Sequence, residues 1–210
     1  MRVRAMKEEV LRNRLKELYL PPTDRFVRVD VPDMRFVMID GKGAADRSAL
    51  DHAAKWLFTL IHPIKRIARE RMGKNFVEPP LECLWWADDM KDFVCGNKDK
   101  LNWRMMIVFE PDWLTAAVFD DCVEKARDRL GEPPASLKLD THREGLCVQI
   151  MHVGPPSALA ATIARMHQEF LPANRLIACG RHHEIYLNDP NRVAPEKLKT
   201  VLRQPVRASR

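Results

Sequence analysis

The residues best suited to chemistry lie near the C-terminal end, in the sequence His182-His183-Glu184-Ile185-Tyr186-Leu187. β-Forming residues run up to Leu187 and Asn188-Asp189-Pro190 supplies a turn, which together predict a short strand. Side chains alternate between the faces of a strand, so one face carries His182, Glu184 and Tyr186. We expect the other face, with His183, Ile185 and Leu187, to point into the core. The first face then sets a carboxylate beside a phenol.

A carboxylate among aromatic rings suits a flat, hydrophobic and often cationic guest, because the rings supply apolar area and cation–π attraction. The structural alternative is a solvent-facing strand in which Glu184 pairs with His182 or an arginine. Adjacent side chains diverge on a regular strand, so His182 and His183 cannot chelate one metal ion, and no third ligand is indicated. We therefore predict neither a metal nor a cofactor.

A similar sequence occurs about one hundred residues earlier, Leu84-Trp85-Trp86-Ala87-Asp88-Asp89, and superposing the two places Trp86 on Tyr186. Each is preceded by an apolar strand that ends at glycine (35–41 and 146–154) and by a helical stretch. Each is followed by another strand (103–109 and 198–204). Four elements in the same order predict a strand-helix-strand-strand unit present twice, rather than a chance likeness between short strands.

The remaining elements are assigned from periodicity and breakers. Amphipathic helices are expected at 6–19, 48–71 and 157–171, with Pro63 kinking or breaking the second. A strand is expected at 26–31 and a crossover helix at about 112–131. A short strand at 138–141 precedes the second unit.

Composition and charge exclude several classes of protein. The net charge is +6, but residues 1–20 carry six Lys/Arg and three Glu and residues 190–210 carry six and one, leaving −2 for residues 21–189. Basic ends on a faintly acidic body disfavour nucleic-acid binding. Five scattered cysteines without metal spacing favour reduced thiols in the cytoplasm. No apolar run is long enough to cross a membrane.

The chain resembles the GyrI-like small-molecule-binding family, whose fold is shared by the effector-binding domains of multidrug-responsive transcription activators. The segments that carry the resemblance are 37–43, 84–89, 145–147, 152–155, 182–187, 194–200 and 202–206. They cover nearly the whole chain in the right order. Cys83 departs from the glycine that the family often has there. No helix-turn-helix is found ahead of these segments, which implies a stand-alone member.

The resemblance implies an α+β fold. Two strand-helix-strand-strand units, related by a pseudo-twofold axis, would form a curved antiparallel sheet with helices on one face and a ligand cleft on the other. Residues 1–33 would be an N-terminal helix and strand packed on the domain at 34–207. That domain would comprise a first half at 34–110, the crossover helix and a second half at 138–207. A homodimer is compatible with this organisation.

The predicted ligand-binding residues combine alternation with the family's use of the glutamate in the second unit. They are Trp86, Glu184, Tyr186, Leu84, Glu82, His182 and Met38. Trp85 and Trp86 point to opposite faces, and we assign Trp86 to the cleft and Trp85 to the core; a one-residue bulge would exchange them.

Three functions follow from the resemblance. The first is binding of hydrophobic, xenobiotic-like small molecules, as in multidrug-binding relatives. The second is hydrolysis of the cyclopropane ring of DNA-alkylating natural products, with Glu184 as general base and Tyr186 as proton donor to the dienone oxygen. The third, inhibition of DNA gyrase as a protein partner, takes its support only from the family's name.

Overall fold

The computed structural model describes residues 15–43, 47–72, 78–89, 92–93, 97–109 and 114–209. The chain divides into two compact units. Residues 33–142 form the first, here called the central unit, and the second combines residues 1–32 with residues 143–210 and is called the terminal unit. The fold is α+β, as predicted, and the strand pairs described within each unit are antiparallel.

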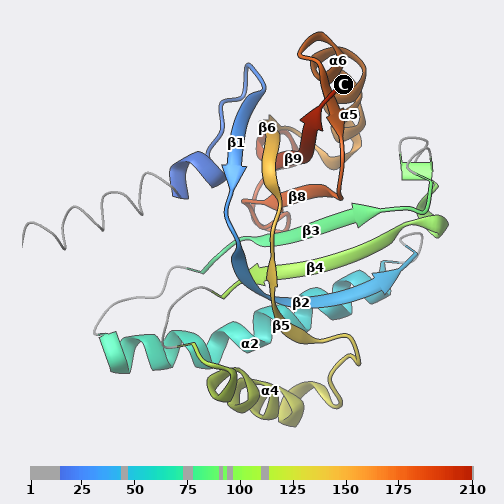
Figure 1. Cartoon of the computed structure of the whole chain (residues 1–210). Helices are drawn as coiled ribbons and strands as arrows, with labels where there is room; N and C mark the ends of the chain where they lie inside the picture. Colours follow the sequence, from blue (N-terminus) through green and yellow to red (C-terminus); the bar gives the residue numbers. More distant parts are fainter. Residues whose placement is uncertain are drawn as a thin grey trace, which may run out of the picture. The chain divides into compact units, whose positions relative to one another are not determined.

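The central unit is a four-stranded sheet with two helices. Its strand order is β5-β2-β4-β3. In chain order its elements are β2 (Met34–Lys42), α2 (Ser48–Met72), β3 (Leu81–Trp86), η1 (Lys98–Lys100), β4 (Asn102–Val108), α4 (Ala116–Leu130) and β5 (Lys138–His142). The long helix α2 packs against β2 and β4, and α4 packs against α2 (Figure 1).

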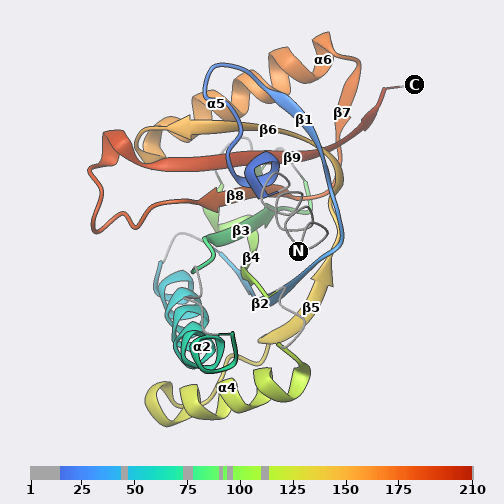
Figure 2. The same cartoon turned by 90° about the vertical axis from the view of Figure 1, so that its left-hand side faces the viewer.

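The terminal unit has the strand order β1-β6-β9-β8, with the short strand β7 paired to the far end of β9. Its elements are β1 (Val27–Val31), β6 (Gly145–Val153), η2 (Pro156–Ala158), α5 (Leu159–Arg165), η3 (Met166–Phe170), α6 (Leu171–Ala173), β7 (Leu176–Ala178), β8 (His182–Tyr186), η4 (Pro195–Lys197) and β9 (Lys199–Ala208). The segment from α5 to α6 runs alongside β6 (Figure 2). Residues 15–19 form a helical turn, and the rest of the predicted helix at 6–19 lies outside the described residues.

The predicted internal repeat is confirmed by the pairing of the strands. In the central unit β4 lies between β2 and β3, and in the terminal unit β9 lies between β6 and β8. Each unit thus contains strand, helix, strand, strand, with the last strand in the middle of the three. Each also gains an outer strand, β5 beside β2 and β1 beside β6.

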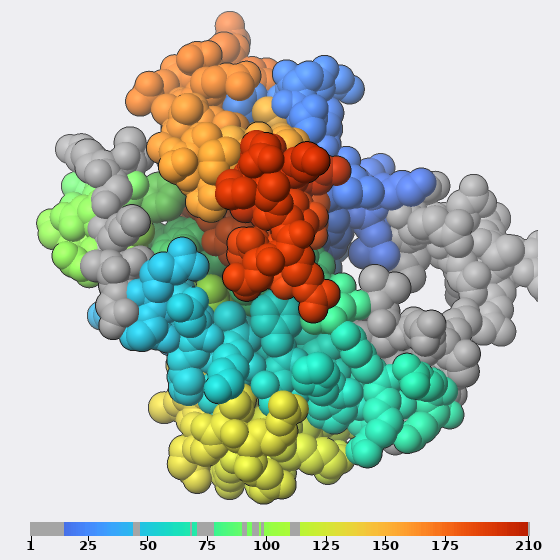
Figure 3. All heavy atoms as spheres, turned by 180° about the vertical axis from the view of Figure 1, so that it is seen from behind, coloured from blue at the N-terminus to red at the C-terminus, as the bar shows by residue number. Residues whose placement is uncertain are grey.

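Two local sequence features bear on the helices of the central unit: the proline within α2 and the capping residue of α4. Pro63 does not interrupt α2, which is assigned without a break, so the predicted break near His62 is absent. The crossover helix α4 is capped by Thr115, whose side-chain oxygen accepts a hydrogen bond from the backbone N–H of Val118. Figure 3 shows α4 lying along α2 at the surface.

The last strand is longer than predicted, and it buries one of the basic residues of the C-terminal segment, Arg203. β9 continues to Ala208, whereas 198–204 was expected, and residues 200–206 are buried. From the basic composition of the C-terminal end we expect the chain to fray after residue 204; this expectation is wrong for the described residues, because β9 continues to Ala208. Helix 157–171 is also subdivided: α5 passes into the π-helical turn η3 at Met166, and Pro172 lies within the following turn α6.

Candidate functional site

Strand β8 positions the most chemically versatile side chains of the terminal unit. Its five residues alternate, so His182, Glu184 and Tyr186 lie on one face and His183 and Ile185 on the other. His183 and Ile185 are fully buried, as predicted. His182 is fully buried as well.

Glu184 and Tyr186 form a hydrogen-bonded pair. The phenolic oxygen of Tyr186 donates to Oε2 of Glu184 at 2.7 Å. The Glu184 side chain is only 12% exposed. A carboxylate withdrawn from water and held by a phenol can accept a proton or a cationic group, and the phenol can pass on a proton through the same bond.

His182 completes this row as a neutral group. Its Nε2 atom lies 3.9 Å from Oε1 of Glu184, which is too long for a hydrogen bond. Burial lowers the pKa of His182 to about 3, and the nearby His167 and His183 act in the same direction. At neutral pH the imidazole is therefore uncharged. The structural alternative, an ion pair between Glu184 and His182, does not form.

The face that carries Glu184 and Tyr186 is the face covered by the helices of the terminal unit. Leu202 lies directly opposite Glu184 on one side and Ile150 on the other. Leu202 and Ile150 belong to a cluster packed with Met166 and Leu171 from the helical segment. Directly opposed residues share a face. The prediction that Glu184 and Tyr186 lie on the side away from the helices is therefore wrong for this unit.

Hydrogen bonding further along the strands supports the same assignment. Tyr186 lies opposite Thr200, and Thr200 lies opposite His152. The Nδ1 atom of His152 is 2.9 Å from the hydroxyl of Thr162 on α5. The prediction failed because alternation fixes which residues share a face, but it does not fix which face a helix covers.

The opposite face of the same strands holds a buried polar network. Arg203 donates from Nη1 to Oε2 of Glu144 at 2.9 Å and from Nε to Oε1 of Gln149 at 3.0 Å. The Nδ1 atom of His183 lies 3.0 Å from Oε1 of Glu144. The side chains of Arg203 and Glu144 are 2% and 3% exposed.

The helical turn at residues 15–19 closes this network. Arg203 donates to the carbonyl of Leu18 at 2.5 Å, and the side-chain amide of Gln149 donates to the carbonyl of Glu17 at 2.6 Å. The last carbonyls of a helix have no partner within the helix, so these donors satisfy them. Tyr19 packs on the adjoining apolar cluster of Met151, Ile185 and Val201.

Burial alone would raise the pKa of Glu144, because it penalises the charged form. The charges and hydrogen bonds of His183 and Arg203 outweigh that penalty and hold the pKa well below its usual range. Glu144 is therefore a buried carboxylate, paired and hydrogen-bonded on both oxygens. The Arg203–Glu144 pair therefore stabilises the packing of β9, because loss of either partner leaves a buried charge without its counter-charge.

In the central unit, strand β3 places Glu82, Leu84 and Trp86 on one face. The register with β4 sets Leu84 opposite Arg104 and Glu82 opposite Met106, and Met106 lies opposite Met38. Glu82, Leu84 and Met38 are fully buried, whereas Trp86 is half-buried. The four predicted residues of this unit therefore share one face.

Trp85 lies on the other face of β3, opposite Trp103 and beside Cys83. The β3–β4 register has no bulge, so the two tryptophans keep the faces that alternation predicts. Trp85 is half-buried, which is less than the core position expected for it.

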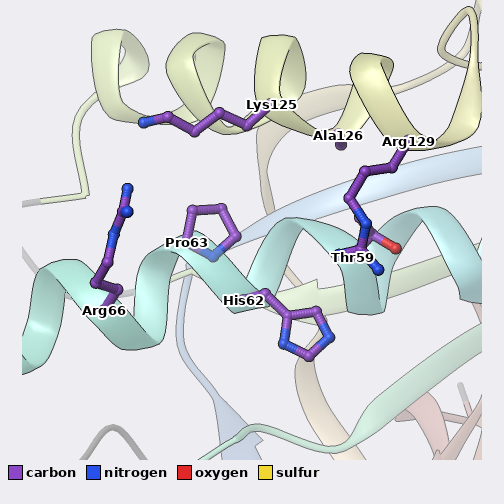
Figure 4. A pocket seen from close by; sticks show the side chains of 7 residues that line it. All are labelled: Thr59, His62, Pro63, Arg66, Lys125, Ala126 and Arg129. Carbon is purple, nitrogen blue, oxygen red and sulfur yellow. The ribbon is translucent and has the colours of Figure 1, made fainter.

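A cavity of about 270 Å³ lies between α2 and α4 of the central unit (Figure 4). It is lined by Thr59, His62, Pro63, Arg66, Lys125, Ala126 and Arg129. Three of these side chains are cations and none is acidic, so the cavity would repel a cationic guest. It includes no residue of the predicted ligand-binding set.

Other classes of site find no support in the described part of the chain. Among the residues that the structure describes, no group of three or more His, Cys, Asp or Glu side chains could hold a metal ion. No described helix is both long and apolar enough to span a membrane.

Comparison with protein families decides the identity of the chain. The model of the GyrI-like small molecule binding domain matches residues 27–207. The chain belongs to the GyrI-like family. The GyrI-like match begins at β1 and ends within β9, so it spans both units.

Solved structures agree with this GyrI-like assignment. An uncharacterised conserved protein from Listeria innocua is 37% identical, with 91% of this chain and 96% of that chain covered and a TM-score of 0.77. A hydrolase from Listeria innocua encoded by lin2189 is 36% identical, with coverage of 91% and 96% and a TM-score of 0.74. The C-terminal domain of EcmrR shares the fold alone, at 12% identity, coverage of 88% and 98%, and a TM-score of 0.56. A comparison with curated proteins finds no match.

Within this GyrI-like domain the predicted residues form two groups. His182, Glu184 and Tyr186 are neighbours in the terminal unit, and Glu82, Leu84, Trp86 and Met38 are neighbours in the central unit. That both groups contact one ligand stays a prediction.

Sequence reasoning missed Glu144, Gln149, Arg203 and Arg104. One signal was available for Arg203: a charged residue between Leu202 and Gln204 in a strand whose neighbours are buried must find a buried partner.

Proposed function

We propose that this GyrI-like domain binds a hydrophobic, xenobiotic-like small molecule through the Glu184–Tyr186 pair. The single observation that carries the proposal is the hydrogen bond of 2.7 Å between Tyr186 and a carboxylate that is 12% exposed. A carboxylate withdrawn from water attracts a cationic or strongly polarised guest more strongly than one in solvent. The family supports small-molecule binding as such.

The predicted residues of the central unit are proposed as ligand-binding residues as well. Trp86 offers a large, half-buried aromatic face beside Leu84. An aromatic ring adds cation–π attraction for a positively charged guest. Glu82, Met38 and His182 are fully buried, so the residues proposed to contact a ligand directly are Glu184, Tyr186 and Trp86.

The test is the binding of a hydrophobic cationic dye, rhodamine 6G, followed by fluorescence polarisation. Glu184→Gln should weaken binding about tenfold, because it removes the charge and keeps the shape. Glu196→Gln, at an exposed position in the same unit, is the matched control. Equal affinity of Glu184→Gln and Glu196→Gln for rhodamine 6G would contradict the proposal.

Trp86 is tested separately against its neighbour. Trp86→Ala should weaken dye binding about tenfold, whereas Trp85→Ala, on the opposite face of β3, should leave the affinity nearly unchanged. If the two variants lose affinity equally, the assignment of Trp86 to the ligand is wrong.

A second candidate function is hydrolysis of a strained ring. Two observations support it. A relative at 36% identity is described as a hydrolase. The Glu184–Tyr186 pair also provides a base and an acid that exchange a proton over a single hydrogen bond. The substrate class would be cyclopropanoid DNA-alkylating compounds, in which a cyclopropane ring is conjugated to a dienone.

Glu184 and Tyr186 together account for every proton transferred in this reaction. Glu184 takes a proton from water as the water oxygen bonds to the cyclopropane carbon and the carbon–carbon bond of the ring breaks. The electron pair moves to the dienone oxygen, which takes the proton of Tyr186 and becomes a phenol. The Tyr186 phenolate then recovers the proton held by Glu184 through their shared hydrogen bond.

Hydrolysis is distinguished from binding by mass spectrometry of a cyclopropanoid substrate. We expect a product heavier by one water molecule with the wild-type protein, and loss of turnover in Glu184→Gln with the substrate still bound. Tight binding without product would leave sequestration as the function. Inhibition of DNA gyrase gains no support from the contacts of the described residues.

A further inference from the structure

An arginine that the sequence does not single out shares the face of the predicted ligand-binding residues in the central unit. Arg104, on β4, lies directly opposite Leu84 on β3 and directly opposite Asp40 on β2. Opposed residues of an antiparallel sheet project to the same side. The face with Glu82, Leu84 and Trp86 therefore also carries a guanidinium group.

Asp40 holds that guanidinium in a fixed orientation. Nε of Arg104 donates to Oδ1 of Asp40 at 2.5 Å and Nη2 donates to Oδ2 at 2.7 Å, which is the paired geometry of arginine and carboxylate. The backbone of Asp40 is fixed in turn, because its N–H donates to the Ser136 hydroxyl, which donates to the Asp40 carbonyl. The hydrogen bond that Arg104 donates to Asp40 raises the pKa of Arg104, so the cation persists.

Part of the guanidinium remains available for a further acceptor. The Arg104 side chain is 13% exposed, and Asp40 occupies only Nε and Nη2. Among the described residues, Nη1 of Arg104 has no hydrogen-bond partner. An arginine carries five N–H donors in a rigid fork, so Nη1 can donate to an acceptor that approaches from solvent.

We propose that Arg104 is a ligand-binding residue whose Nη1 group donates a hydrogen bond to an acceptor oxygen of the small molecule. This inference rests on the proposed function, and it narrows the ligand class. The ligand would be an aromatic compound that bears a carbonyl group, and not a purely hydrocarbon cation. Asp40 acts as the positioning residue, because it neutralises the guanidinium and aims its free edge.

The Arg104–Asp40 pair makes the two candidate functions distinguishable. A cationic guest gains nothing from a neighbouring guanidinium, whereas a carbonyl group accepts its hydrogen bond. A conjugated dienone carries such an oxygen. Arg104 therefore favours ligands that bear a carbonyl group.

The test compares two probes that differ only in the acceptor, 9-fluorenone and fluorene, by equilibrium dialysis. The wild-type protein should bind fluorenone about tenfold more tightly, since a hydrogen bond to a charged donor contributes about that factor. In Arg104→Met/Asp40→Asn, which leaves no unpaired charge, the affinity for fluorenone should fall to that for fluorene. The affinity for fluorene should stay unchanged.

Arg104→Lys provides a second variant that preserves the charge. Lysine can pair with Asp40 but lacks the planar fork, so the preference for fluorenone should still fall severalfold. Equal binding of the two probes by the wild-type protein, or an undiminished preference in the double variant, would overturn the proposal. Binding of neither probe would contradict the proposed function, and the inference with it, whereas binding without preference contradicts the role of Arg104 alone.

Discussion

Arg203 and Glu144 form an ion pair with 2.9 Å between Nη1 and Oε2, in which both side chains are at most 3% exposed. The pair lies on the face of β9 opposite to the one that Leu202 shares with Glu184. The pair therefore stabilises β8 and β9 from one face of the sheet, while the Glu184 carboxylate lies on the other face.

Removing one member of this pair should destabilise the fold strongly. We expect Arg203→Met to lower the free energy of unfolding by about 3–5 kcal/mol, because Glu144 would keep a buried charge with only His183 beside it. Arg192→Met, which breaks an exposed pair with Asp189, should cost at most about 1 kcal/mol. Urea denaturation of both variants makes the comparison. Equal losses would show that Arg203–Glu144 is not the anchor.

Acidification should destabilise the protein in a window set by His182. Its pKa is lowered to about 3 in the folded state, against an ordinary value of 6.5. Below pH 6.5 the unfolded chain therefore binds a proton that the folded chain does not, and stability is lost as the pH falls toward 3. Each pH unit within this range should cost up to about 1.4 kcal/mol from this residue.

The measurement is urea denaturation at pH 7, 6 and 5. His182→Gln should reduce the slope of unfolding free energy against pH, while His62→Gln, at an exposed position on α2, should not. The depressed pKa of Glu144 lowers the stability only below about pH 4.5, the ordinary pKa of a glutamate. Loss of stability between pH 7 and pH 5 therefore reports on the histidines. An unchanged slope in His182→Gln would contradict the buried, neutral imidazole.

Gly41 should tolerate no side chain. A Cβ atom there would lie 2.1 Å from Cζ2 of Trp103, whose indole N–H donates to the carbonyl of Gly43 at 2.8 Å. Gly41→Ala should therefore lower the melting temperature through a loss of about 1–3 kcal/mol from overpacking. Adding Trp103→Leu should remove part of the clash, so the double variant should lose less stability than the sum of the single variants. Additive losses would contradict the contact.

The sequence was sufficient to predict the repeated unit and most of its elements. The alternation in 182–187 correctly grouped Glu184 with Tyr186, and the apolar runs gave β6 and β4 to within about two residues. These features are local, because periodicity and turn residues act within a few positions of the chain. The orientation of α5 on the sheet is not local, and there the prediction was wrong.

The polar network could not be predicted in the same way. The network joins three separate parts of the chain: Glu144 and Gln149 at β6, Arg203 on β9 and the carbonyl of Leu18. Their partners follow only from the strand register. The same holds for Arg104 and Asp40, which are 64 residues apart. A lone charge in an apolar strand indicates that a partner exists, but it does not say which one.

The most direct test of the central claim is a crystal structure of the protein with rhodamine 6G bound. We predict that the dye lies against the Glu184 carboxylate, within about 6 Å of its oxygens, with Tyr186 in contact. A dye seated in the cavity between α2 and α4, or anywhere else with the Glu184–Tyr186 hydrogen bond untouched, would contradict the account.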